Sequence, residues 1–288
     1  MAVVNTNANA SIAQNALARN ERAMNTAMER LSTGQRINTA GDDAAGLAIS
    51  SRMTSQIRGL EAGIRNANDA ISMIQTADGA LVEVTNMLQR MRELAIQASN
   101  GTTTSADRSY LSSEYMNLLS EIDRIAENTQ WNGKNIFNHT TAGSSTIAYQ
   151  VGANGGQTID VDFGDMTNSA SGTFTALTAL NGSGGITAAT AANAITVGTS
   201  AVAAVDAAIT AVNSQRATYG ATINQLTYAV DNLSNVKVNA EASRSRVLDT
   251  DYARETAELA RTQIIQQAGT AMLAQANQLP QTVLSLLQ

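Results

Sequence analysis

Cysteine is absent from the 288 residues, histidine and proline occur once each, and aromatic residues make up only 3%. A chain without cysteine forms no disulfides, and the single His139 leaves it short of the usual zinc ligand sets. So few aromatic side chains indicate that there is no bulky central core, whereas abundant alanine favours close approach of helices. Stability must therefore come from helix packing or from assembly with other molecules.

Charged side chains are missing from both ends of the chain. The first is Arg19 and the last is Arg261, and the formal net charge is −6. A negative chain lacks the basic surface that nucleic-acid binding requires. No apolar run is long enough to span a membrane, and the first residues lack the basic and apolar regions of a secretory signal. We therefore expect no nucleic-acid partner, no membrane segment and no cleaved signal peptide.

The chain also offers few residues that are suited to catalysis. His139 lies in a turn-like Asn-His-Thr sequence without an identifiable nucleophile or orienting acid nearby, so a surface histidine is the better interpretation. Asp160, Asp162 and Asp165 stand in a stretch of alternating polarity, which favours outward-facing strand carboxylates over a calcium loop. The glycine-rich residues 182–185 lack the lysine of a phosphate loop. We predict that the chain is not an enzyme and binds no cofactor.

Long helices are the strongest positive signal. Apolar residues recur at alternating steps of three and four from Leu60 to Ala98, with one phase slip between Ile74 and Ala77. A helix from residue 43 to residue 98 would be about 80 Å long. A second seam of this kind runs from Val202 to Leu233 and is its natural antiparallel partner. The prediction is a mainly α fold, an elongated rod of long antiparallel helices in a coiled-coil-like bundle.

The two ends are predicted to be amphipathic helices that pair at one end of the rod. Gly34 suits a left-handed C-cap for the first helix, and Asp42 is the expected N-cap of the long one. Because polar uncharged residues lie opposite each apolar stripe, we expect both faces to be covered by protein in the working form, with frayed tails in the free monomer as the alternative. The predicted stripes are Ile12, Ala16, Leu17, Asn20, Ala23, Met24, Ala27, Met28 and Leu31, and Ala257, Ala260, Ile264, Ala268, Ala271, Met272 and Ala276.

The middle of the chain differs in composition. Residues 147–163 alternate in polarity around an Ala-Asn-Gly-Gly turn, which predicts a β-hairpin at the far end of the rod. The Gly-, Ser- and Thr-rich stretch after it reads as a short variable insert. The predicted domains are residues 1–42 and 249–288 for the terminal helices, 43–175 and 200–248 for the rod, and 176–199 for the insert.

Three segments resemble hallmarks of the bacterial flagellin family, in the order in which they occur there. They are Gly41–Ile49 (GDDAAGLAI), Leu88–Gln97 (LQRMRELAIQ), and the tail from Ile264 to Leu287. The similarity covers about residues 1–175 and 198–288, and the chain resembles a short form without large outer domains. The resemblance implies a subunit of the extracellular flagellar filament, exported through the flagellar type III apparatus without a cleaved signal.

The resemblance also implies partners. The subunit polymerises with itself and meets the filament cap, the hook–filament junction proteins and an export chaperone. Its terminal helices form the inner core of the filament and fold fully only on assembly. On this family pattern the inner-core residues are Ile12, Leu17, Met24, Met28, Leu31, Ile264, Ile265, Met272, Leu273 and Leu279.

Two recognition roles are carried over from the family. The tail residues Val283, Leu284, Leu286 and Leu287 resemble the part bound by the export chaperone and by a cytosolic inflammasome sensor of the host. A second surface resembles the one that the flagellin-sensing Toll-like receptor reads on monomers, with packing and solvation as the plainer explanation of the same residues. Its residues are Leu88, Gln89, Arg90, Arg92, Glu93, Leu94, Gln97 and Glu114.

Two alternatives share the helical architecture. A hook–filament junction protein has similar terminal motifs but does not polymerise indefinitely, and the extent of the tail similarity favours a filament subunit. A dimeric coiled-coil signalling rod would have charged exteriors at its ends and a membrane anchor, and the sequence shows neither.

Overall fold

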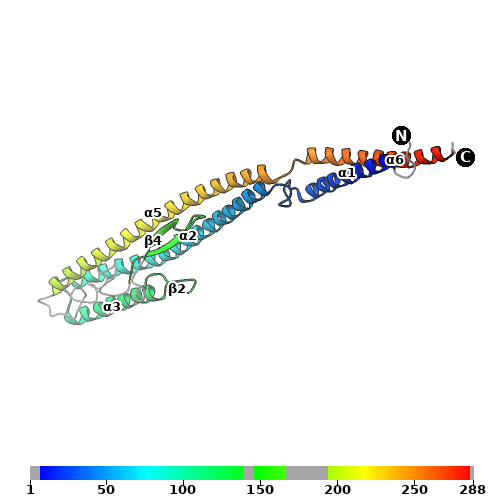
Figure 1. Cartoon of the computed structure of the whole chain (residues 1–288). Coiled ribbons are helices and arrows are strands. Elements are labelled where there is room, and N and C mark those ends of the chain that lie inside the picture. Colours follow the sequence, from blue (N-terminus) through cyan, green and yellow to red (C-terminus); the bar gives the residue numbers. More distant parts are fainter. Residues whose placement is uncertain (1–6, 139–145, 167–193, 286–288) are drawn as a thin grey trace. The chain divides into compact units, whose positions relative to one another are not determined.

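The computed structural model describes residues 7–138, 146–166 and 194–285 (Figure 1). Helices dominate these residues, which confirms the prediction of a mainly α fold. None of the described helices combines the length and the hydropathy that a membrane crossing requires. The helices are α1 (Ala8–Thr33), α2 (Ala44–Ala98), α3 (Ser105–Asn128), α5 (Ala194–Leu248) and α6 (Tyr252–Ser285). The strands are β1 (Gln130–Trp131), β2 (Lys134–Asn135), β3 (Thr146–Gln150) and β4 (Thr158–Asp162).

The chain divides into two compact units. The terminal unit comprises Met1–Ile57 and Val238–Gln288, and the central unit comprises Arg58–Lys237. Both α2 and α5 contribute to each unit. The domain boundaries expected after residues 42 and 248 lie in the links between helices, inside the terminal unit, and the functional division that they describe stays a prediction.

In the central unit α2 and α5 run antiparallel, as the two seams predict. Three ion pairs join them, and residue numbers rise along α2 as they fall along α5. The pairs are Glu61–Lys237 at 2.8 Å, Asp78–Arg216 at 2.7 Å and Arg92–Asp206 at 2.6 Å. The middle pair lies beside the phase slip between Ile74 and Ala77, so the one charged seam position of α5, Arg216, has its partner where the apolar rhythm of α2 is broken.

The core of the central unit is built from the predicted seam of α2. Its side chains between Ala67 and Ala98 are mostly buried, together with positions on α5 and on α3. Burial raises the pKa of the Tyr115 phenol on α3 to about 12, so this side chain stays neutral across the physiological range. The largest fully buried side chains of this core are Ile74, Leu81, Leu88, Met91, Leu94, Tyr115, Ile122, Ile136, Phe137, Phe163 and Tyr219.

The helix caps follow from side chains near each start and stop. The first helix ends at Gly34, whose φ of 71° confirms the predicted left-handed cap. The expected N-cap of α2 is wrong by one residue: the carboxylate of Asp43 accepts the N–H of Gly46 at 2.9 Å. Asp42 instead accepts N–H groups of Thr39 and Asn38 within the preceding link, and the bond from the Thr39 backbone is the main reason that its pKa is lowered.

The predicted hairpin is present as β3 and β4, paired antiparallel from Thr146↔Asp162 to Gln150↔Thr158. Its expected place at the far end of the rod is wrong, because its turn lies against Gly59 and Gly63 in the first half of α2. It rests on both long helices, because Asn66 of α2 donates to the carbonyl of Gln150 at 2.9 Å and Tyr219 of α5 donates to the carbonyl of Phe163 at 2.8 Å. A second small hairpin, β1–β2, directly follows α3. Asn132 and Gly133 both have positive φ, as a tight two-residue hairpin turn requires.

Two glycines of α2 give a matched test of how closely the hairpin approaches the helix. A Cβ atom at Gly63 would lie 2.5 Å from the carbonyl oxygen of Val151, whereas one at Gly79 would meet nothing within 4 Å. Gly79→Ala should raise the free energy of unfolding by about 1 kcal/mol, since alanine favours helix over glycine. Gly63→Ala should lower it, because the backbone of the hairpin must move. Chemical denaturation followed by circular dichroism measures both, and equal stabilisation by the two variants would contradict the close contact.

Candidate functional site

The terminal helices α1 and α6 pack against each other along a heptad seam. On both helices the covered side chains recur at steps of three and four, as in a two-stranded coiled coil. On α1 they are Ala10, Ala13, Leu17, Asn20, Met24, Ala27 and Leu31. On α6 they are Glu255, Leu259, Thr262, Gln266, Gly269, Leu273 and Ala276.

The deepest positions of this seam are small or polar. Among the described side chains of the two helices, the buried apolar ones are Ala10, Ala27 and Ala276, and the other buried ones are polar. Small residues let the helices approach closely, but they remove little apolar surface from water, and hydrophobic stabilisation scales with that surface. The two helices therefore lie close together, but their contact gains little free energy from the hydrophobic effect.

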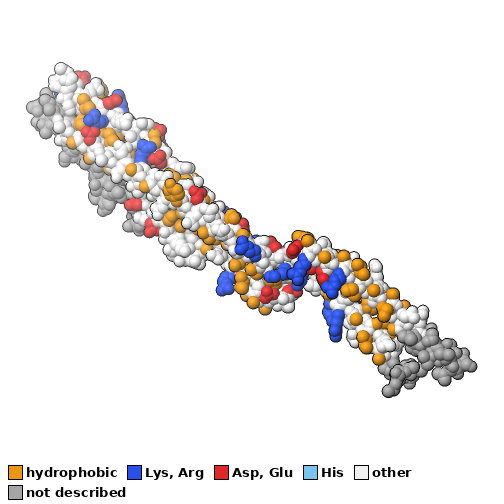
Figure 2. Space-filling model, turned by 90° about the horizontal axis from the view of Figure 1, so that it is seen from above, with side chains coloured by type: hydrophobic (Ala, Val, Ile, Leu, Met, Phe, Trp, Pro, Cys, Tyr) orange, Lys and Arg blue, Asp and Glu red, His pale blue; other side chains and the backbone are white. Residues whose placement is uncertain are grey.

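Several large apolar side chains of the pair point outward instead. Ile12 on α1 and Ile264 and Met272 on α6 are about two-thirds exposed. In Figure 2 hydrophobic side chains are spread over the visible face of these helices, and charged side chains gather away from the chain ends. The apolar stripe predicted for α6 is thus not the side that meets α1, since of its members only Ala276 is buried.

The predicted inner-core residues divide accordingly. Half-buried positions in the seam hold Leu17, Met24, Leu31 and Leu273. The exposed group is Ile12, Met28, Ile264, Ile265 and Met272. The side chain of Leu279 lies outside the described residues.

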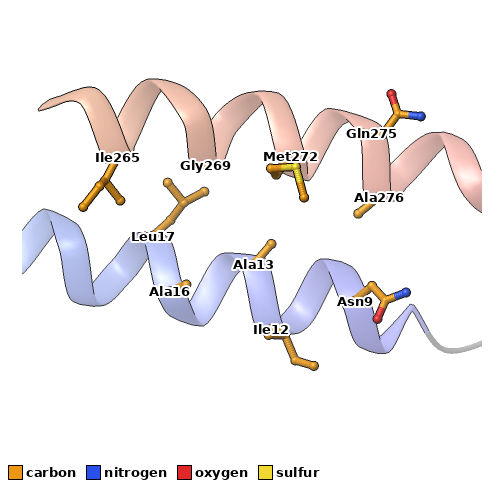
Figure 3. A pocket seen from close by; sticks show the side chains of 10 residues that line it. All are labelled: Asn9, Ile12, Ala13, Ala16, Leu17, Ile265, Gly269, Met272, Gln275 and Ala276. Carbon is orange, nitrogen blue, oxygen red and sulfur yellow. The ribbon is translucent and has the colours of Figure 1, made fainter. Parts of the chain in front are cut away.

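An apolar hollow of about 490 Å³ opens between the two helices (Figure 3). Leu17 extends from α1 toward Gly269 of α6, where a Cβ atom would come within 2.6 Å of its terminal methyl group, so a larger residue at this position would require the leucine to shift. Ile12 lines the same hollow but points away from α6. The hollow is lined by Asn9, Ile12, Ala13, Ala16, Leu17, Ile265, Gly269, Met272, Gln275 and Ala276.

Directed polar contacts cross the pair at three levels. All three were missed as functional features by sequence reasoning, although Asn20 stood in the predicted stripe as a polar residue among apolar ones. The contacts are Asn7 Nδ2 to the carbonyl of Ala276 at 2.9 Å, Asn20 Nδ2 to the carbonyl of Thr262 at 2.8 Å, and Arg30 Nη1 to Glu255 Oε1 at 3.3 Å.

A second candidate surface lies on α2 and α3 of the central unit. Arg90 pairs with Glu114 of α3 at 2.8 Å and with Glu93 at 3.0 Å. The hydrogen bond to Glu114 is the main reason that the pKa of Arg90 is raised above its ordinary value. Gln89 and Gln97 are exposed beside this cluster, and Arg92 is exposed and bonded to Asp206.

Two residues of the predicted receptor surface are inside the core. Leu88 and Leu94 are fully buried, Leu88 as the seam periodicity predicts and Leu94 as part of the core that α2 shares with α3. A buried side chain does not meet a partner docked on the surface. For a surface contact we therefore retain only the accessible residues Gln89, Arg90, Arg92, Glu93, Gln97 and Glu114.

The side chains of the remaining predicted residues are not among those that the structure describes. Val283 and Leu284 lie within α6, but their side chains are not among those described, and Leu286, Leu287 and His139 lie outside the described residues. Among the residues that are described, no three His, Cys, Asp or Glu side chains are grouped so as to hold a metal ion.

Comparison with known proteins identifies relatives for both halves of the chain. Residues 4–142 match the family described as the bacterial flagellin N-terminal helical region, and residues 202–287 match the bacterial flagellin C-terminal helical region. The chain is 45% identical over 262 residues to a flagellin from Halalkalibacterium halodurans, covering 91% of each protein. It is 43% identical over 291 residues to a flagellin from Bacillus subtilis, covering 95% of this chain and 96% of that one.

Among solved structures, the chain resembles a protein from Vibrio parahaemolyticus described as flagellar hook-associated. The TM-score is 0.55 at 16% identity, and the match covers 72% of this chain and 100% of the other. At this identity the likeness shows a shared fold and nothing further.

Proposed function

Because this chain belongs to the bacterial flagellin family and is a structural subunit of the extracellular flagellar filament, we propose that the outward apolar side chains of α1 and α6 hold neighbouring subunits together. The observation that carries the proposal is that Ile12, Ile264 and Met272 are about two-thirds exposed on helices that bury mainly alanine. Contiguous exposed apolar surface marks an interaction site, and many copies of one chain can cover it in an open helical polymer.

The same composition supports a role before assembly. Residues 262–288 carry no charge, and the pair that α6 forms with α1 buries little apolar surface. Such ends gain most of their order from the partner that covers them, which is coupled folding and binding. We propose that the chain is exported without a cleaved signal, that an export chaperone and the host inflammasome sensor read the leucine-rich tail, and that the filament cap and the hook–filament junction proteins meet the terminal helices.

We favour the filament subunit over a hook–filament junction protein. The relatives named flagellin match over nearly the whole chain at 43–45% identity, whereas the likeness to a hook-associated protein is one of fold. The function inferred is assembly for motility, without catalysis.

A further role is proposed for the monomer as a ligand of the flagellin-sensing Toll-like receptor. The support is the exposed cluster of Arg90, Glu93 and Glu114, with Gln89 and Gln97 beside it. Arginine is enriched among residues that dominate binding at protein interfaces, and here its guanidinium is already oriented by two carboxylates.

The assembly proposal is tested by the double variant Ile264→Asn with Met272→Asn. Burying two such side chains contributes about 3 kcal/mol or more, so the critical concentration for filament formation should rise at least about a hundredfold. Sedimentation and electron microscopy of the full chain measure this. The matched control, Gln263→Asn with Gln267→Asn, changes two exposed polar residues of α6 and should assemble normally. Filaments from the apolar-to-polar variant at the ordinary concentration would contradict the proposal.

The receptor proposal is tested by Arg90→Ala in monomeric full-length protein applied to receptor-reporter cells. The half-maximal concentration should rise by about tenfold or more, because an interface arginine is lost. Arg124→Ala is the control, since it removes another exposed arginine–glutamate pair, that with Glu121 on α3. Equal potency of the two variants would remove Arg90 from the contact.

A further inference from the structure

Asn20 occupies a seam position of α1 that an apolar residue would normally fill. It is 9% exposed, and its neighbours along the seam are Leu17 and Met24. Its amide donates to the carbonyl of Thr262 at 2.8 Å and to Oε1 of Gln266 at 3.2 Å, and both partners are seam positions of α6. Asn20, Thr262 and Gln266 thus form a polar layer within the pair.

The apolar residues of the pair do not define a single alignment. The seam of α6 contains Leu259 and Leu273 beside glutamate, threonine, glutamine, glycine and alanine, while isoleucine and methionine cover its outer side. Large apolar residues recur on both seams at multiples of seven residues, so sliding α6 along α1 by one heptad exchanges similar apolar contacts. The exception is Leu17, which would meet Ala276 in place of Gly269. The hydrophobic effect is non-directional, so it cannot select among such alignments.

The polar layer does distinguish them. With α6 shifted by one heptad, Gly269 and Leu273 would take the places of Thr262 and Gln266 opposite Asn20. The amide would then lose its side-chain acceptor, and an unsatisfied buried polar group is costly. A single buried asparagine in a coiled-coil seam fixes register and orientation in this way. The contacts of Asn7 with Ala276 and of Arg30 with Glu255 agree with the same antiparallel alignment.

We propose that Asn20 is the residue that selects the register of α1 against α6. It acts by excluding shifted alignments, and it contributes little to the helicity of the pair. In a polymer whose subunits present many similar uncharged helices to one another, this gives each pair of terminal helices the same alignment.

The absence of cysteine allows a direct test by disulfide formation in the full chain. Leu17→Cys with Gly269→Cys reports the register of the structure, because a Cβ atom at position 269 lies 3.1 Å from Leu17 Cγ. Leu17→Cys with Ala276→Cys reports a shift of one heptad, about 10 Å along the helix. Oxidation followed by denaturing electrophoresis separates linked single chains from linked dimers, and it can be read whether or not filaments form.

With Asn20 present, the disulfide between positions 17 and 269 should form within single chains and the shifted link should not. In Asn20→Leu, the ratio of in-register to shifted links should fall about tenfold, the effect of losing two ordinary hydrogen bonds. Asn25→Leu adds the same bulk at an exposed position of α1 and should leave the ratio unchanged. An unchanged ratio in Asn20→Leu would overturn the proposal, as would loss of helix content by circular dichroism or failure of the parent pair to link in register.

Discussion

The packing of α1 against α6 through small and polar side chains is the constraint on which the rest of the terminal unit depends. Alanine and glycine bring the two backbones close, and Leu17 packs against position 269, which has no side chain. The leucines and the methionine of the seam are only half-buried, and Ile12, Ile264 and Met272 lie outside it. A helix pair with so little buried apolar area gains little against the entropy of ordering its residues.

The central unit is stabilised in a different way from the α1–α6 pair. There α2 buries isoleucine, leucine and methionine against α3, α5 and the β3–β4 hairpin, and three ion pairs cross from α2 to α5. Large side chains are inside and charges outside, so this unit has its own hydrophobic core. The chain thus combines a unit that buries its large apolar side chains with a helix pair that leaves several of them exposed, which suits a subunit that polymerises with other copies.

The sequence predicted the long helices and their antiparallel pairing because a strict rhythm of three and four residues coincides there with charged outer faces. It failed on α6, where apolar residues occur on every side and no charge marks the outer face beyond Arg261. The burial of Leu94 could not be read from α2 alone, because the covering side chains come from another part of the chain. The importance of Asn20 was visible only as a polar residue in an apolar stripe, and its partners became known once α6 was in place.

The N-cap of α2 is a second case in which the sequence alone does not decide between candidates. Asp42 and Asp43 are equally good capping residues, and the geometry of the link, in which Thr39 and Asn38 donate to Asp42, leaves Asp43 to cap the helix. Local propensity names the candidates, and tertiary contacts choose among them.

Hydrogen exchange of the full chain, in dilute solution and in sedimented filaments, tests most directly whether the terminal helices depend on neighbouring copies. In dilute solution the amides of α1 and α6 should exchange rapidly while the buried face of α2 in the central unit stays protected. In filaments both should be protected. Strong protection of α1 and α6 in the dilute chain, equal to that of the central unit, would contradict the dependence on neighbours.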